Sequence, residues 1–158
     1  MELSVTQENF ARALSIVGRV ASNRTGLPIL GNILLRTDGT RLLVAATNLE
    51  IAATCYVGAK IVKQGDITLP ARLVSDYVGS LPKGTIELSS KGTSMTIASG
   101  NYSSIMTGVD ATEFPELPSI DEKQAVTYTI AEADFKQAIS QTIITTSNDT
   151  SRPVLTGV

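Results

Sequence analysis

Apolar residues near the start of the chain recur at helical spacing after a short strand-like segment. Residues 2–5 predict a strand, and Thr6 is placed to cap the following helix with its hydroxyl. We expect one face of this helix to be buried and the other to lie in solvent. The buried face carries Phe10, Ala13, Leu14 and Val17, and the polar face carries Arg12, Ser15 and Arg19.

Three strand-like runs follow, at 29–37, 41–47 and 50–59. The dipeptide Asp38-Gly39 favours a hairpin between the first two runs. A strand at 66–70 then leads into a second helix within 70–82, with Pro70 and Ala71 in its first turn and Arg72 off its apolar side. That apolar side is expected to carry Leu73, Val74, Tyr77, Val78 and Leu81.

Strands are also predicted at 85–90, 94–99 and 102–109, separated by Lys91-Gly92 and Gly100-Asn101 turns. The order is βαβββ, followed by strand, helix and three strands. This order indicates an α+β domain with two helices packed on antiparallel sheets.

An internal repeat becomes visible when the chain is shifted by 125 residues without a gap. Phe10 then coincides with Phe135 and Pro28 with Pro153, and the identities fall on both the helix core and the turn after it. Such a long period indicates a repeated domain. Residues 127–158 are expected to supply a strand, a helix and the start of the next strand of a second copy, so the chain is expected to be a fragment of a longer protein.

The domain boundaries follow from this repeat. We expect a first domain at 1–118, a linker at 119–126 and the truncated start of a second domain at 127–158. The acidic, proline-containing segment 110–122 does not have the ligand spacing or the glycine of a calcium loop, and is interpreted as solvated linker.

Composition limits the class of protein. The 158 residues are 42% hydrophobic and 18% charged, enough for one core of ordinary size. No apolar run approaches the roughly 20 residues that cross a bilayer, and the first residues do not resemble a signal peptide. A cytoplasmic protein with no membrane partner is expected.

The chain contains no histidine and one cysteine, Cys55, in an apolar run. Disulfide and zinc sites are therefore excluded, and the commonest general base is missing. We expect no cofactor, no metal site and no catalysis, although a carboxylate enzyme stays open as a remote alternative.

Five motifs, in order, resemble one family. They are LPILGNILL at 27–35, TNLEI at 47–51, LPARLVSDYVGSLP at 69–82, EFPELP at 113–118 and SRPVLTGV at 151–158. Together they closely resemble the bacterial DNA polymerase III beta subunit, the sliding clamp. The resemblance implies a clamp fold with one complete domain and the start of a second. It also implies a homodimeric ring around double-stranded DNA that makes DNA polymerase III processive and has a clamp loader and other clamp-binding proteins as partners.

Site residues follow from the same resemblance. Arg24 and Arg72 match arginines that contact DNA, and contacts to phosphates alone suit a protein that slides. A net charge of −2 does not oppose this, because a basic inner surface can coexist with acids elsewhere. Arg12 and Arg19 share the same side by helical spacing.

Protein contacts are also implied. Ile105 and Met106 fall in the family's subunit-contact strand, and Arg152 and Leu155 match part of its partner-peptide pocket. Three positions depart from the family pattern and weaken the expectation there, namely Asp149 in the second turn and Asn101 and Ser103 in the contact strand. A stand-alone adaptor with the clamp fold, which contacts proteins without encircling DNA, remains the alternative function.

Overall fold

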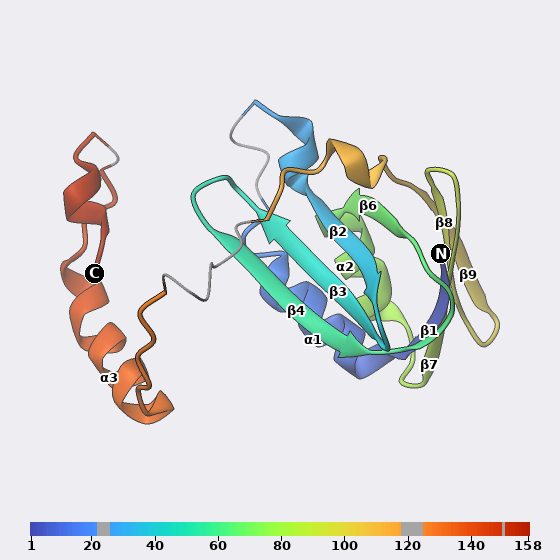
Figure 1. Cartoon of the computed structure of the whole chain (residues 1–158), viewed down its shortest axis with the longest axis horizontal. Helices are drawn as coiled ribbons and strands as arrows, with labels where there is room; N and C mark the ends of the chain where they lie inside the picture. Colours follow the sequence, from blue (N-terminus) through green and yellow to red (C-terminus); the bar gives the residue numbers. More distant parts are fainter. Residues whose placement is uncertain (22–25, 118–124, 150) are drawn as a thin grey trace. The chain divides into compact units, whose positions relative to one another are not determined.

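The computed structural model describes residues 1–21, 26–117, 125–149 and 151–158. The chain divides into two compact units, Met1–Pro118 and Ser119–Val158. The elements of the first unit, in chain order, are β1 (Glu2–Thr6), α1 (Gln7–Val17), the 3-10 turn η1 (Pro28–Gly31), β2 (Asn32–Asp38), β3 (Arg41–Thr47), β4 (Ala52–Gly58), β5 (Lys60–Lys63), β6 (Asp66–Pro70), α2 (Ala71–Ser80), β7 (Thr85–Lys91), β8 (Ser94–Ser99), β9 (Tyr102–Thr107) and η2 (Ala111–Glu113) (Figure 1).

Two antiparallel sheets and two helices build the first unit. One sheet has the strand order β5-β1-β7-β8-β9 and the other the order β4-β3-β2-β6. Helices α1 and α2 contact each other and lie side by side on one side of the sheets (Figure 1). The expected α+β architecture, two helices packed on antiparallel sheets, is confirmed for this unit.

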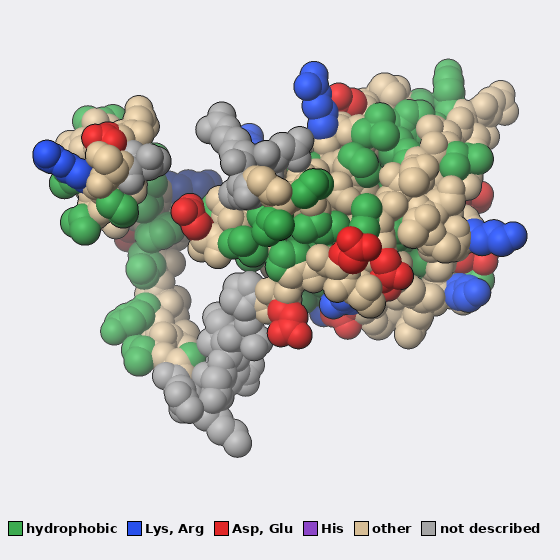
Figure 2. Space-filling view, turned by 90° about the horizontal axis from the view of Figure 1, so that it is seen from above, with side chains coloured by type: hydrophobic (Ala, Val, Ile, Leu, Met, Phe, Trp, Pro, Cys, Tyr) green, Lys and Arg blue, Asp and Glu red, His purple; other side chains and the backbone are tan. Residues whose placement is uncertain are grey.

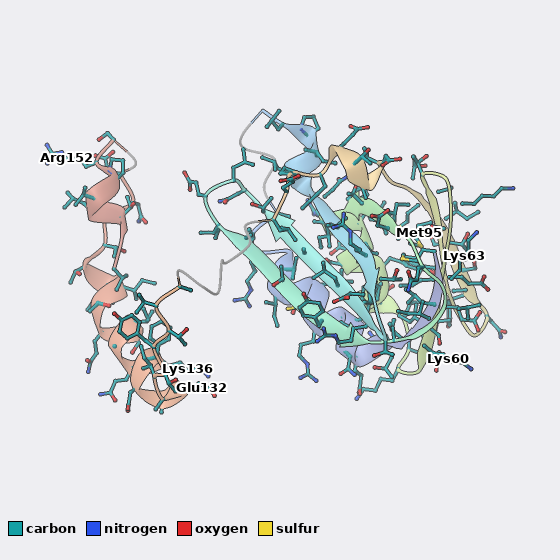
Figure 3. All side chains as sticks on the ribbon, viewed as in Figure 1. Lys60, Lys63, Met95, Glu132, Lys136 and Arg152 are labelled. Carbon is teal, nitrogen blue, oxygen red and sulfur yellow. The ribbon has the colours of Figure 1, made fainter. Side chains whose placement is uncertain are left out.

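The main core of the first unit lies where both sheets meet the two helices. Phe10 and Leu14 of α1, Val74 of α2 and Met95 of β8 are all buried in it (Figure 3). Residues alternate across a strand, so β2 turns Ile33 and Leu35 toward this core. Burial of this one apolar layer is the main force that holds sheets and helices together.

All three predicted hairpins form around two-residue loops. Asp38 pairs with Arg41, so the loop consists of Gly39 and Thr40, and Lys91 pairs with Ser94. Gly39 and Gly92 adopt φ values of 57° and 58°, in the left-handed region that favours glycine. Glycine at these positions therefore explains why short sequence signals located these turns.

Several local predictions were wrong. Strand β5 was missed, because it has four residues, with an exposed lysine at each end, and pairs only at the edge of its sheet with β1. The Thr6 hydroxyl makes no cap hydrogen bond within the described residues, and the Gln7 N–H donates to the carbonyl of Gly84 at 2.8 Å. The run from residue 29 begins as the turn η1, and strand β2 starts at Asn32.

Helix α2 also differs from its prediction, both in its first residue and in which of its apolar residues are buried. Pro70 belongs to β6 and precedes the helix, which starts at Ala71. Leu73 is 51% exposed, while Ala71, Val74 and Val78 are buried. The buried stripe is thus narrower than the hydrophobic pattern suggested.

The first part of segment 110–122 is not solvated linker. Ala111 and Phe114 are buried against Leu34, Leu43 and Ala45, on the face of the β2–β3 pair opposite the main core. A bridge between Thr68 and Val109 ties the start of this segment to β6. These contacts join residues up to Leu117 to the first unit, and residues 118–124 lie outside the described part.

The second unit repeats local elements of the first. Helix α3 (Glu132–Thr142) follows α1 by 125 positions at both ends, and the turn η4 (Pro153–Thr156) follows η1 in the same way; η3 (Ile143–Thr145) lies between them. The predicted strand at 127–131 does not form, and none of the residues of α3, all of them described, is buried. A strand needs neighbours, and the described residues of this unit offer none.

Candidate nucleic-acid interface

Arg72 lies in the first turn of α2, where the backbone N–H groups have no acceptor within the helix. Proline, which has no side-chain acceptor, occupies the N-cap, and the first turn contains no acid. The helix dipole adds a partial positive charge at this end. The Arg72 guanidinium, on a side chain that is 95% exposed, therefore adds to an end that is already electropositive.

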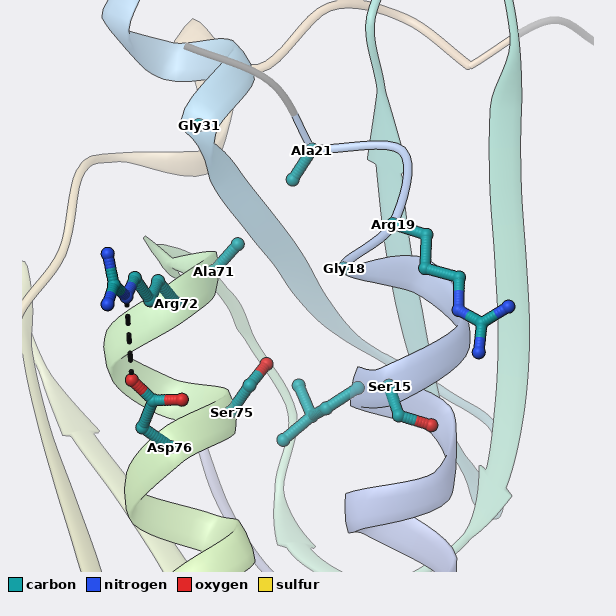
Figure 4. A pocket seen from close by; sticks show the side chains of 10 residues that line it. Ser15, Gly18, Arg19, Ala21, Gly31, Ala71, Arg72, Ser75 and Asp76 are labelled. Carbon is teal, nitrogen blue, oxygen red and sulfur yellow. Dashed lines mark ion pairs between the residues drawn. The ribbon is translucent and has the colours of Figure 1, made fainter.

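A hollow of about 360 Å³ lies between α1 and α2 at this end (Figure 4). Arg19, which follows α1, and Arg72 of α2 belong to its lining, together with Ser15, Ser75 and the acidic Asp76. The helices come close at Gly18, where an added Cβ would lie 3.7 Å from the Ser75 hydroxyl oxygen. The two arginines and the Ser75 hydroxyl can donate hydrogen bonds to an anion, whereas the Ser15 hydroxyl donates to the carbonyl of Arg12 at 2.9 Å and the Asp76 carboxylate repels an anion.

Arg72 has one ionic partner among the described residues. Its Nε lies 3.7 Å from Oδ2 of Asp76, one helical turn further on, and the Asp76 side chain is 74% exposed (Figure 4). Both groups face water, so the pair holds the guanidinium only weakly. Arg12 of α1 and Arg19, two residues after its end, are also exposed.

Arg24 lies outside the described residues. The described chain stops at Ala21 and resumes at Gly26. Ala21 belongs to the lining of the hollow between the helices, and Gly26 lines a second hollow, of about 450 Å³, which also includes Arg72. The two ends of the segment that contains Arg24 are therefore both close to the start of α2.

Strand β9, the expected contact strand, forms an edge of its sheet. Ile105 is 71% exposed on it, whereas Met106 is only 3% exposed and packs in the main core. Adjacent residues of a strand point to opposite faces, so Ile105 is the exposed side chain of the pair and Met106 packs inward. The subunit contact expected at these two residues stays a prediction, and Asn101 and Ser103 are exposed.

Arg152 and Leu155 are brought together in the second unit by the turn η4. The Leu155 N–H donates to the carbonyl of Arg152 at 2.9 Å, and both side chains are exposed (Figure 3). Figure 2 shows hydrophobic side chains on the surface of this unit, and Phe135, Ile144 and Leu155 are among the exposed ones. Arg152 and Leu155 are thus both exposed at one turn of this unit.

Asp149, in the turn that precedes η4, is ionised at neutral pH. A hydrogen bond from the Ser151 hydroxyl, helped by the Ser151 backbone N–H at 2.9 Å from Oδ1, lowers the pKa of the Asp149 carboxyl. A fixed negative charge repels phosphate. Asp149 thus departs from the family pattern by placing a negative charge in this turn.

The described residues contain no group of three or more histidine, cysteine, aspartate or glutamate side chains placed to hold a metal ion. No helix among them is both long and apolar enough to cross a membrane.

The first unit matches a known protein domain over its whole length. Residues 1–118 fit the model of the DNA polymerase III beta subunit, N-terminal domain. The chain belongs to the DNA polymerase III beta subunit family. The resemblance seen in the five sequence motifs is therefore confirmed.

Relatives of this family match the chain from end to end. The beta sliding clamp of Synechococcus elongatus is 34% identical over 163 residues, which cover 100% of this chain and 42% of the relative, and that of Bacillus subtilis is 30% identical and covered to 44%. Among solved structures, the Bacillus subtilis DNA polymerase sliding clamp matches with a TM-score of 0.93 at 28% identity, over 100% of this chain and 43% of that one. The DNA polymerase III subunit beta of Pseudomonas aeruginosa gives a TM-score of 0.90 at 26% identity, over 99% of this chain and 43% of that one. The chain thus spans about two fifths of the length of the beta clamps it matches.

Sequence reasoning missed two residues of the interface. Ser75 comes to line the hollow only because α1 and α2 pack together at Gly18, which no local pattern reveals. Asp76 could have been found, since an acid four residues after Arg72 lies next to it on any helix.

Proposed function

We propose that this chain is the first part of a sliding clamp, a homodimeric ring that encircles duplex DNA and tethers the replicative polymerase to its template. The ring catalyses nothing and acts in the cytoplasm, where a bacterial chromosome lies. Its partners are DNA polymerase III, other clamp-binding proteins and the clamp loader. Family membership supports this proposal, together with the electropositive first turn of α2.

The DNA contact is proposed for Arg24 and Arg72. The observation that carries it is Arg72 in the uncapped first turn of α2, beside a hollow that Arg19 also lines. These groups can neutralise phosphates without reading a base edge, so the ring can move along any sequence.

The protein contacts are proposed for two other places. Ile105, exposed on the edge strand β9, offers an apolar side chain and unpaired strand groups to a second subunit. Arg152 and Leu155 supply one wall of a pocket for the apolar peptides of clamp-binding proteins. The rest of that pocket would be formed by residues outside the 158 of this chain.

Encirclement is tested by topology. The full-length protein, loaded by its clamp loader onto a nicked circular plasmid, should remain bound through gel filtration and should be lost when a restriction enzyme linearises the plasmid. Equal retention on circular and linear DNA would contradict a ring, and would favour the adaptor alternative if clamp-binding peptides still bound.

The phosphate contacts are tested by substitution. Replacing both Arg24 and Arg72 with Ala should weaken binding equally on unrelated duplex sequences and flatten the plot of log affinity against log salt by about two units at most. An Arg36→Ala variant is the matched control, because Arg36 is an exposed arginine with an aspartate partner on the sheet face opposite the helices. If the double variant kept the parental salt slope, these arginines would not contact phosphates.

A further inference from the structure

We infer that Asp76 restrains Arg72 and thereby weakens the hold of the α1–α2 surface on duplex DNA. The inference rests on the proposed function, because it concerns the strength of the phosphate contact made by Arg72. It assigns to Asp76 the part of a positioning residue, which acts through the guanidinium and does not itself bind DNA.

The geometry favours competition for one guanidinium. Asp76 Oδ2 lies 3.7 Å from the Nε of Arg72, and both side chains project on the same side of α2 (Figure 4). A phosphate that approaches the first turn of α2 meets the Arg72 side chain together with the free N–H groups of that turn. It also meets the Asp76 carboxylate one turn away, which repels it and draws the guanidinium down the helix.

Helix stability does not account for the pair. An acid placed four residues before a base is the favourable order on a helix, and here the arginine comes first. A cation in the first turn also opposes the helix dipole. The pair is thus in the less favourable order, at the less favourable end, which is understandable if Arg72 is placed for an anion and Asp76 limits its strength.

A sliding protein gains from such a limit. Each phosphate contact must break for every step along the duplex, so a contact that is too strong slows movement, while a ring does not need tight binding to stay on DNA. An aspartate beside the arginine lowers the affinity and leaves the contact in place.

The test uses the 158-residue chain and a fluorescein-labelled duplex of about 20 base pairs, with anisotropy followed from about 20 mM salt upward. Asp76→Asn keeps the size of the side chain and removes its charge. We expect it to bind the duplex about two- to fivefold more tightly than the parent chain, the range that exposed ion pairs supply. In an Arg72→Ala background the same change should tighten binding less, because it then removes only the direct repulsion between the Asp76 carboxylate and phosphate and no longer releases Arg72.

Asp66→Asn is the matched control. It removes one negative charge and frees an arginine, Arg36, from a pair at 3.2 Å, but on the sheet face opposite the helices. If it tightened binding as much as Asp76→Asn, the effect would be one of net charge and the inference would be wrong.

The remaining outcomes separate the inference from the proposed function. If Arg72→Ala weakens binding and Asp76→Asn binds like the parent chain, the inference fails and the phosphate contact stands. If Arg72→Ala binds like the parent chain, or the parent chain does not bind at the lowest salt, the phosphate contact fails and the inference falls with it. Far-ultraviolet circular dichroism of each variant checks that the fold is unchanged.

Discussion

Gly108 is the position where one added methyl group should damage the first unit most. It follows β9, where the chain passes from the five-stranded sheet to β6 of the other sheet. A Cβ at Gly108 would lie 2.0 Å from the backbone oxygen of Thr68 and 3.0 Å from Cδ2 of Leu69. The oxygen belongs to the backbone of a strand and cannot rotate away, so the Gly108→Ala variant must move the two segments apart by more than about 1 Å.

The loss of stability can be estimated from the hydrogen bonds that this movement would break. Thr68 and Val109 exchange two backbone hydrogen bonds, of 3.0 and 3.1 Å, and the Thr68 hydroxyl donates to the Val109 carbonyl at 3.0 Å. Loss of these bonds costs about 1 kcal/mol each, and overpacking adds about 1–3 kcal/mol. Gly108 lies outside the left-handed φ region, so no strain from φ adds to this sum. We expect Gly108→Ala to lower the free energy of unfolding by about 4–6 kcal/mol, a large part of the usual stability of a domain.

Urea unfolding followed by circular dichroism measures this loss. With a slope of about 2 kcal/mol/M, the midpoint should fall by about 2–3 M. Gly79→Ala is the control, because Gly79 lies within α2 with open space around its Cα, and the change should raise stability by about 0.5–1 kcal/mol. A Gly108→Ala midpoint within about 0.3 M of the parent value would refute the steric argument.

Two further predictions concern the repeat and the pH dependence of stability. Phe10 is fully buried and Phe135, its equivalent in the second unit, is 53% exposed. In urea unfolding, Phe10→Ala should therefore lower the free energy of unfolding by about 3–5 kcal/mol and Phe135→Ala by less than about 0.5 kcal/mol. Equal losses would contradict the difference in burial. The hydrogen bond from Lys83 Nζ to Glu8 Oε1, at 2.6 Å, lowers the pKa of Glu8 below 4.5 and raises that of Lys83 above 10.5. The ion pair therefore contributes fully to stability between pH 4.5 and pH 10.5, the ordinary pKa values of the two groups. This contribution is lost as pH falls through the lowered pKa of Glu8 or rises through the raised pKa of Lys83. The thermal midpoint of Glu8→Gln should lie below that of the parent chain at neutral pH and meet it in acid, and a gap that persists in acid would show that the pair is not its cause.

Local signals explain what the sequence predicted well. The apolar spacing of Phe10, Leu14 and Val17 places one face of α1 in the core, and glycine at Gly39 and Gly92 marks hairpin loops that require a positive φ. These features depend on residues within a few positions of each other, so a single sequence contains them.

The wrong predictions concern features that depend on contacts between residues far apart in the sequence. The first N–H of α1 donates to the carbonyl of Gly84, far along the chain, and the cap expected from the Thr6 hydroxyl does not form. Phe114 looked like part of a solvated linker because its partners, Leu34 and Leu43, come from two other strands. In the candidate site, helical spacing predicted the exposed Arg12 of α1, while the hollow beside Arg72 required the packing of both helices.

The two copies of the repeat show the same division between local and distant causes. Helices α1 and α3 span equivalent residues, because a helix closes its hydrogen bonds within its own segment. Strand β1 forms because Leu3 pairs with Ile61 of β5 on one side and with Leu88 of β7 on the other. Residues 127–131 repeat its place in the sequence and, within the described residues, have no such neighbours and form no strand.

The same contrast decides where an apolar face is buried. In the first unit Phe10 and Leu14 are buried in a core to which both sheets contribute, whereas the corresponding Phe135 and Ile139 lie on a helix without a buried residue. The apolar pattern of a helix therefore specifies which face will be covered, and only partner strands from elsewhere in the sequence can cover it. For this family, the helix pattern identifies a repeat, and the complete set of strands makes it a stable domain.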